Sequence, residues 1–226
     1  MGALRVIWAP VSTLARVAEE RQVLLGFSVV ALYAALGLVG GAIAVFGGLT
    51  QTQFESGGAQ PPPGFEDFVA YVGVFSLVSA VVQPFVLWLL VSGLMQLVTR
   101  FFGGTGPFSG MLAVVGVAQA PLVVFTVLYI PITGLEIVLG PQDPASGNPV
   151  PAVLGLLSAL LGLAFLLWHA TLVVIGAAFA RRVGYGESTG SCAISCAGCV
   201  GLILIVVVVI VVLVAVVAGA ASGGWS

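Results

Sequence analysis

Residues 23–48 read VLLGFSVVALYAALGLVGGAIAVFGG, an apolar run that contains no charged side chain. The hydrocarbon core of a bilayer is crossed by about 20 apolar residues in an α-helix, so this run is long enough to span it. It is also too long for the apolar part of a secretory signal, which has roughly 7–15 residues. We therefore expect this segment to stay in the membrane.

Four further stretches have the same character, at residues 68–98, 111–139, 151–180 and 193–221. Of the 226 residues, 60% are hydrophobic and 6% are charged, whereas soluble domains carry about 25% charged residues. Strands of a membrane barrel would alternate apolar and polar residues, but these runs are continuous. We predict an all-α, polytopic membrane bundle of five transmembrane helices, with residues 1–22 ahead of the membrane domain (23–221) and a tail at 222–226.

All six basic residues are arginines, and their positions support five spans. Three precede the first span, namely Arg5, Arg16 and Arg21. Arg100 lies between the second and third spans, and Arg181 and Arg182 lie between the fourth and fifth. Basic residues in short loops are retained in the cytoplasm, so we expect a cytoplasmic N-terminus and a C-terminus outside. The absence of lysine favours a prokaryotic origin, and hence the plasma membrane. A net charge of −2 provides no basic stripe for nucleic acid.

The segment ahead of the first span predicts a short interfacial helix. Pro10 suits the first position of a helix, and four apolar residues follow on one side: Val11, Leu14, Val17 and Ala18. Trp8 adds an anchor at the level of the lipid headgroups. We expect this helix to lie along the cytoplasmic surface.

Three cysteines, Cys192, Cys196 and Cys199, have a spacing that can ligate an iron–sulfur cluster in soluble enzymes. On a helix they fall on one face at the mouth of the fifth span, where cysteine acts as a small packing residue. We expect packing, with lipid or redox modification as the alternative. The sequence predicts no metal and no cofactor.

The run from Gly103 to Gly110 is rich in glycine, but it lacks the Lys-Ser/Thr ending of a phosphate-binding loop and no strand precedes it. We interpret Gly103, Gly104 and Gly106 as parts of a tight turn between two helices. The chain also has no Ser/His/acid arrangement in an accessible polar loop, no H-E-x-x-H motif and no intramembrane aspartate pair. We therefore expect no enzymatic activity.

Three polar residues lie within predicted spans, namely Gln83, Gln119 and His169. Polar groups inside a membrane are functional candidates. Gln119 and His169 lie at similar distances from the cytoplasmic side, so we predict a hydrogen bond between them. Such residues either hold helices together or line a path for a solute through spans kinked by Pro84, Pro121 and Pro131.

Three groups of residues resemble the Yip1 domain family of small five-span membrane proteins. Trp8-Ala9-Pro10 is similar to the proline-led entry before the family's first span. The run from Phe101 to Phe108 is similar to the family's glycine-rich turn with an aromatic residue, here Phe108, and is followed by the step Val117-Ala118-Gln119-Ala120-Pro121 into a membrane proline. Trp168 and the run from Gly184 to Ser188 resemble the fourth span and the loop before the last one.

The resemblance implies a five-span fold. Eukaryotic members of the family are associated with vesicle traffic between endoplasmic reticulum and Golgi and with lipidated Rab GTPases. This chain lacks the long N-terminal region of that branch, so we do not expect it to bind a GTPase. We expect a non-enzymatic scaffold or interaction protein, in contact with the bilayer and with a membrane or cytoplasmic protein. A small transporter or channel subunit using spans two to four is the alternative, and the sequence leaves self-association open.

Overall fold

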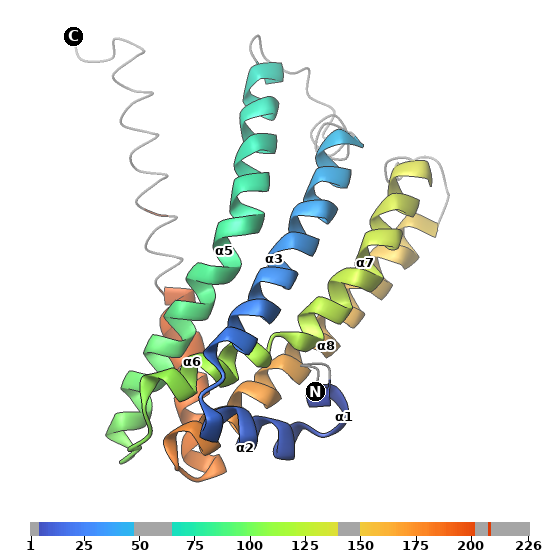
Figure 1. Cartoon of the computed structure of the whole chain (residues 1–226). Helices are drawn as coiled ribbons and strands as arrows, with labels where there is room; N and C mark the ends of the chain where they lie inside the picture. The colour runs from blue at the N-terminus through green and yellow to red at the C-terminus, as the bar shows by residue number, and fades with distance from the viewer. Residues whose placement is uncertain (1–4, 48–64, 140–149, 202–207, 209–226) are drawn as a thin grey trace, which may run out of the picture.

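The structure is a computed structural model that describes residues 5–47, 65–139, 150–201 and 208. Within these residues the chain forms helices, shown in Figure 1: α1 (Arg5–Trp8), α2 (Pro10–Glu20), α3 (Val23–Phe46), α5 (Phe65–Phe101), α6 (Phe108–Val117), α7 (Ala120–Leu139) and α8 (Val150–Arg181). A further helix occupies residues 185–201. The all-α prediction is confirmed for this part of the chain.

Four segments are long and apolar enough to cross a membrane: Val23–Phe46, Ala70–Phe101, Phe108–Leu135 and Val153–Arg181. They correspond to the first four predicted spans. The fifth predicted span, 193–221, and the tail at 222–226 lie largely outside the described residues, so the count of five stays a prediction.

The third predicted span is two helices rather than one, because the chain breaks between α6 and α7. Pro121 has no N–H, so it cannot donate the helical hydrogen bond to the carbonyl of Val117. The backbone tightens instead: the N–H of Gln119 donates to the carbonyl of Gly116 at 3.1 Å, and that of Leu122 donates to the carbonyl of Gln119 at 2.9 Å. Pro84 and Pro131, by contrast, lie inside the unbroken helices α5 and α7.

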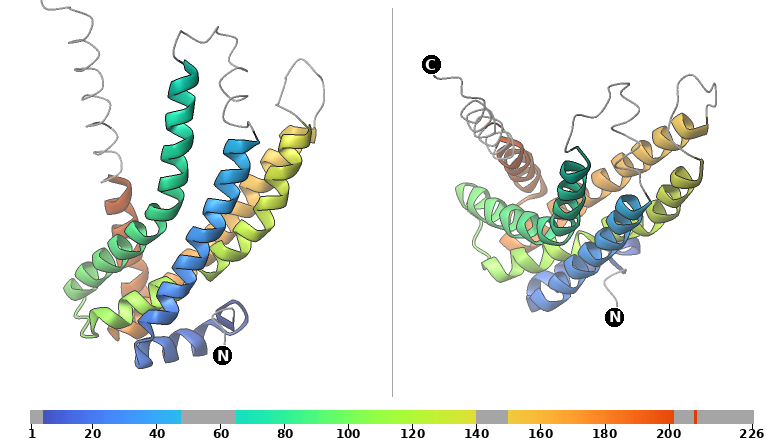
Figure 2. Two further views of the ribbon diagram at one scale, coloured as in Figure 1. Left: turned by 45° about the horizontal axis from the view of Figure 1, so that its top comes forward. Right: turned by 90° about the horizontal axis from the view of Figure 1, so that it is seen from above.

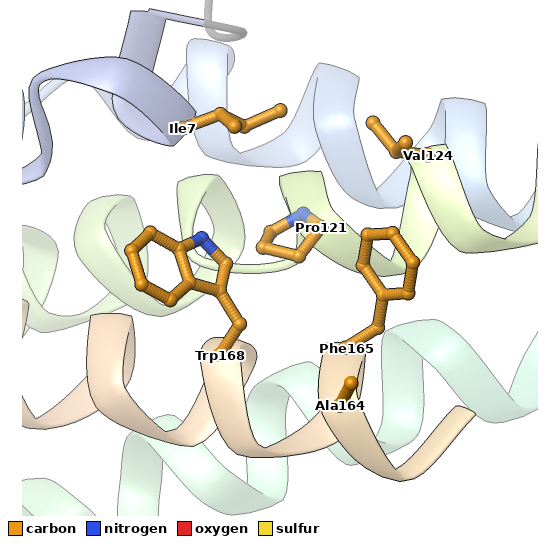
Figure 3. Close-up of a pocket in the computed structure, with 6 residues that line it drawn as sticks. All are labelled: Ile7, Pro121, Val124, Ala164, Phe165 and Trp168. Carbon is orange, nitrogen blue, oxygen red and sulfur yellow. The ribbon is translucent and has the colours of Figure 1, made fainter. Parts of the chain in front are cut away.

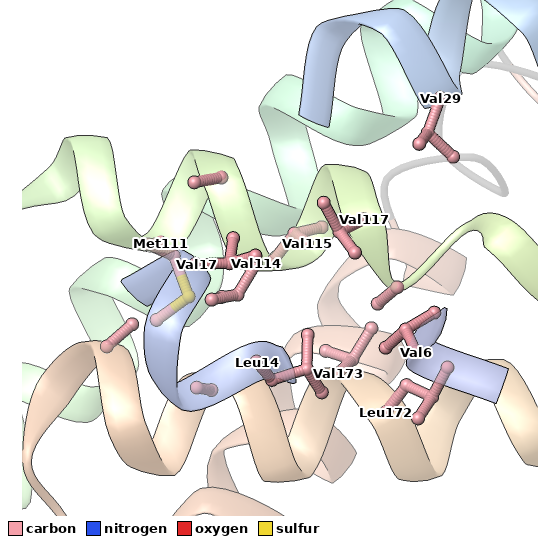
Figure 4. Close-up of a cluster of buried hydrophobic side chains, with 14 of the residues drawn as sticks. Val6, Leu14, Val17, Val29, Met111, Val114, Val115, Val117, Leu172 and Val173 are labelled. Atoms are coloured by element: carbon pink, nitrogen blue, oxygen red, sulfur yellow. The ribbon is translucent and has the colours of Figure 1, made fainter. Parts of the chain in front are cut away.

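The buried core gathers around α6. Figure 4 shows side chains of α6 meeting those of α1, α2, α3 and α8, among them Val6, Leu14, Val114 and Leu172. In an apolar 18-residue window of the Phe108–Leu135 span 61% of the residues are buried, against 17%, 11% and 17% in the corresponding windows of the other three spans. The other spans therefore turn most of their apolar surface outward, as expected for helices that contact lipid.

The helix predicted ahead of the first span is α2, and Pro10 is its first residue. Its buried residues are Thr13, Leu14, Val17 and Ala18. Val11, which we placed on the apolar side, is 50% exposed, because α2 packs against α6 and α8 through a face centred on Leu14 and Val17. Arg21, in the left-handed conformation at φ 50°, ends the helix and turns the chain into α3.

One end of the bundle carries the N-terminal helices, the turn between α5 and α6 and the end of α8 (Figures 1 and 2). All six arginines belong to these segments: Arg5, Arg16 and Arg21 to the N-terminal helices and the turn after them, Arg100 to the end of α5, and Arg181 and Arg182 to the end of α8. We call it the arginine end. The fold thus brings together the basic residues that the sequence distributes over three separate segments.

Candidate functional site

The glycine-rich turn at 103–107 packs against the end of α8 at the arginine end. The N–H of Thr105 donates to the carbonyl of Arg181 at 3.1 Å. A Cβ atom on Gly106 would lie 1.6 Å from the carbonyl oxygen of Ala180, so only glycine fits this approach. Gly103 has a φ of 80° and supplies the reversal. The turn is therefore a close joint between two helices, as the sequence indicated.

Arg181 closes this joint with its side chain, which is only 2% exposed. Its Nε donates to the hydroxyl of Thr99 at 3.1 Å, and its Nη2 donates to the carbonyl of Gly104. The Thr99 hydroxyl in turn donates to the carbonyl of Met95 at 2.6 Å. Sequence reasoning used Arg181 as a marker of topology and missed this role, because nothing in its local pattern distinguishes it from the exposed Arg182.

His169 lies beside the break between α6 and α7, but its predicted partner is wrong. Its Nδ1 lies 2.8 Å from the carbonyl oxygen of Ala118, whereas the buried Oε1 of Gln119 has no hydrogen-bond partner among the described residues. The carbonyl of Ala118 is available because the N–H of Leu122 donates to Gln119 instead. The histidine therefore satisfies a backbone group that the break releases.

The three intramembrane polar candidates do not form one cluster. Gln83 is exposed on α5, Gln119 is 6% exposed inside the core and His169 is bonded to backbone. No hydrogen bond joins any two of them within the described part of the chain.

The remaining family-motif residues begin or end helices. Trp8 ends α1 and is 86% exposed, and Phe108 begins α6 and is 41% exposed. Pro10 begins α2, and Pro121 is buried just after the break. Gly104 provides the carbonyl that Arg181 binds.

Serines, not cysteines, form the buried stripe of the helix at residues 185–201. Ser188, Ser191 and Ser195 are buried, and the Ser188 hydroxyl donates to the carbonyl of Val174 at 2.7 Å. Their spacing of three and four residues places them on one face of the helix.

The cysteines of this helix do not share one environment. Cys192 and Cys199 are half-buried and Cys196 is exposed. Burial is the main cause that raises the pKa of Cys192, which precedes the predicted fifth span, to about 11. Among the described residues, no group of three His, Cys, Asp or Glu side chains is placed to hold a metal ion.

Comparison with known proteins finds a family match and a related protein for this chain. A family model described as the Yip1 domain matches residues 4–215. The chain is also similar to the uncharacterized protein MJ0794 of Methanocaldococcus jannaschii, with 31% identity over 71 residues. That match covers 31% of this chain and 50% of the relative, so it spans about half of the relative's length. No solved structure matches the chain.

Proposed function

Because the chain belongs to the Yip1 domain family, we propose that it is a non-enzymatic scaffold or interaction protein in membrane organisation or trafficking. We also propose five spans, a cytoplasmic N-terminus, an outer C-terminus and residence in a prokaryotic plasma membrane, on the basis of the arginine distribution. In this orientation the arginine end faces the cytoplasm and presents its surface to a protein partner.

The observation that carries this proposal is that the arginine end is charged on its surface and tightly packed beneath it. Five arginines are exposed: Arg5, Arg16, Arg21, Arg100 and Arg182. Under them lie the core around α6 and the buried side chain of Arg181. A surface that is already ordered loses less conformational freedom when it binds, which favours association.

Transport has no comparable support. A solute path through the second to fourth spans would need the polar groups of these spans to line one passage. Gln83 instead faces outward, and the ring of His169 is engaged by the carbonyl of Ala118. The described parts of the second to fourth spans therefore do not bring these polar groups into one passage.

Photo-crosslinking in native membranes tests the interaction proposal. Phe102 follows α5 at the arginine end and is 41% exposed, and Phe75 lies in the first half of α5 and is 73% exposed. Each is replaced, one at a time, by the photoreactive benzoylphenylalanine, so that both probes replace the same residue type. Irradiated cells are extracted in mild detergent, and the adducts are identified by mass spectrometry.

We expect a discrete protein adduct from position 102 and lipid adducts from position 75. The Phe102 adduct should weaken when Arg100 and Arg182 are both replaced by Glu, since two positive charges of this surface then become negative. Identical adducts from the two positions, or no protein adduct from position 102, would contradict the proposal.

A further inference from the structure

Two cavities flank the junction of α1 and α2, which we call the elbow (residues 5–16). The first is apolar, with a volume of about 250 Å³, and is lined by Ile7, Pro121, Val124, Ala164, Phe165 and Trp168. Figure 3 shows Trp168 and Phe165 rising from α8 on either side of Pro121, with Ile7 of α1 across from them. The cavity exists because Pro121 follows the break in the third span, which removes the regular helical surface at this point.

The second cavity is polar, with a volume of about 150 Å³, and is lined by Arg5, Ser12, Thr13 and Arg16. Thr13 is 7% exposed and belongs to the buried face of α2. Arg5 and Arg16 are exposed, and each makes a further interaction within the chain. Two guanidinium groups beside two hydroxyls make a donor-rich site, since each guanidinium carries five N–H donors.

We propose that the elbow binds one anionic phospholipid, with its phosphate in the polar cavity and part of one acyl chain in the apolar cavity. Arg5 and Ile7 are two residues apart in the single turn of α1 and line one cavity each. Residues two apart point to opposite sides of a helix, so the two cavities lie on either side of α1. Because α1 has only four residues and is about 6 Å long, one lipid that passes over this short helix can place its head on one side and an acyl chain on the other. Neither cavity alone matches a whole lipid.

The charges select the headgroup. Arginine binds phosphate oxygens with paired, charge-assisted hydrogen bonds, and the described residues that line the polar cavity include two arginines and no carboxylate. A zwitterionic headgroup would bring its ammonium group next to two guanidinium groups, whereas an anionic headgroup adds no positive charge. The acidic residues of α2, Glu19 and Glu20, lie at the far end of that helix.

The location also suits a lipid. Trp8, next to Ile7, is 86% exposed, and tryptophan favours the headgroup level of a bilayer. The apolar cavity is smaller than the roughly 300–1,000 Å³ of sites that enclose drug-sized molecules, and a part of one acyl chain needs less room. Trp168, 40% exposed, forms an open wall of this cavity, so a chain can enter sideways from the bilayer.

The test measures lipid binding to the purified full-length chain by native mass spectrometry. The probes are phosphatidylglycerol and phosphatidylcholine with identical acyl chains, and soluble glycerol phosphate is the competitor. The variant R5Q/R16Q removes both charges that line the polar cavity. Its matched control is R100Q/R182Q, which removes two other arginine charges from the same end of the bundle. A164F fills the apolar cavity, and A159F, on an exposed position of α8, is its control.

We expect one phosphatidylglycerol per chain and weaker binding of phosphatidylcholine. R5Q/R16Q should bind phosphatidylglycerol at least about tenfold more weakly, since hydrogen bonds to charged groups are lost. A164F should also weaken binding, and both controls should stay within about twofold of the parent chain.

Three results would overturn the proposal. Equal losses in R5Q/R16Q and R100Q/R182Q would mean diffuse attraction to anionic lipid. Displacement by glycerol phosphate would mean a site for a soluble phosphate. Equal binding of the two lipids to the parent chain would remove the headgroup selection, and this comparison needs no variant to fold.

Discussion

The Nδ1 atom of His169 lies 2.8 Å from the carbonyl oxygen of Ala118, in a different span. A carbonyl oxygen only accepts, so Nδ1 carries the proton and donates it. The bond connects α8 to the two-residue break between α6 and α7, where regular helical hydrogen bonding is lost. The only histidine of the chain thus joins the fourth span to the third.

Replacement of His169 should therefore affect stability according to whether the bond can be kept. In H169L the carbonyl of Ala118 loses its donor, and leaving a buried acceptor unsatisfied costs about 1–3 kcal/mol. In H169N the side-chain amide nitrogen takes nearly the place of Nδ1, so a smaller loss is expected. The free energy of unfolding in detergent would measure both, and an H169N chain as unstable as H169L would contradict the assignment.

The joint at Gly106 predicts a large effect from a single methyl group. In G106A the new Cβ would lie 1.6 Å from the carbonyl oxygen of Ala180, so the turn and α8 must separate. Overpacking typically costs about 1–3 kcal/mol, and we expect the upper end of this range or more. The matched control is G93A in α5, where a Cβ meets nothing within 4 Å. Equal melting temperatures for the two variants would show that the close approach does not exist.

Arg181 and Thr99 should be energetically coupled, because the Arg181 Nε donates to the Thr99 hydroxyl. A double-mutant cycle with R181M and T99V isolates this bond from the other losses. We expect a coupling of about 1.5–3 kcal/mol, as for hydrogen bonds to charged groups. Since the pair is buried, the coupling should hardly change with salt. A coupling near zero, or one that disappears at 1 M salt, would mean an exposed contact.

The thiol of Cys192 should ionise late as the pH rises. With its pKa raised to about 11, mainly by burial, this thiol is protonated at neutral pH, and the thiolate that reacts with alkylating reagents grows only above pH 9. A chain carrying C196S and C199S loses the smaller contributions of Cys196 to this pKa and keeps the main one, burial, so the alkylation rate should still be increasing at pH 10. A rate that is half-maximal near pH 9 would indicate an ordinary, solvated thiol.

The spans were predicted well because a membrane-spanning helix is recognised from its length and apolar composition alone. Four predicted runs correspond to helices of the structure, and Pro10 marked the start of α2. The break at residues 118–119 was harder to predict from the sequence. Pro121 and Pro131 both lie in the predicted third span, yet only Pro121 follows a break, because packing around α6 decides which proline interrupts the helix.

The contacts at the candidate sites depend on backbone groups that a sequence does not display. The depth estimate correctly brought His169 to the neighbourhood of Gln119, but the released carbonyl of Ala118 is a product of the break. The burial of Arg181 follows from the approach of the glycine turn, which joins segments far apart in the chain. The choice of Thr13 over Val11 for the buried face of α2 likewise reflects where α6 and α8 lie.

The packing of α2 against α6 and α8 has a consequence for how the protein is made. α2 leaves the ribosome long before residues 150–181 exist, and synthesis proceeds at about 5–20 residues per second. The surface that covers Leu14 and Val17 is thus completed only roughly 10–30 s later. During that interval the apolar side of α2 must be shielded from water in another way, and the bilayer surface next to the inserted first span can cover it. The last step of folding would then be the transfer of this helix from lipid onto protein.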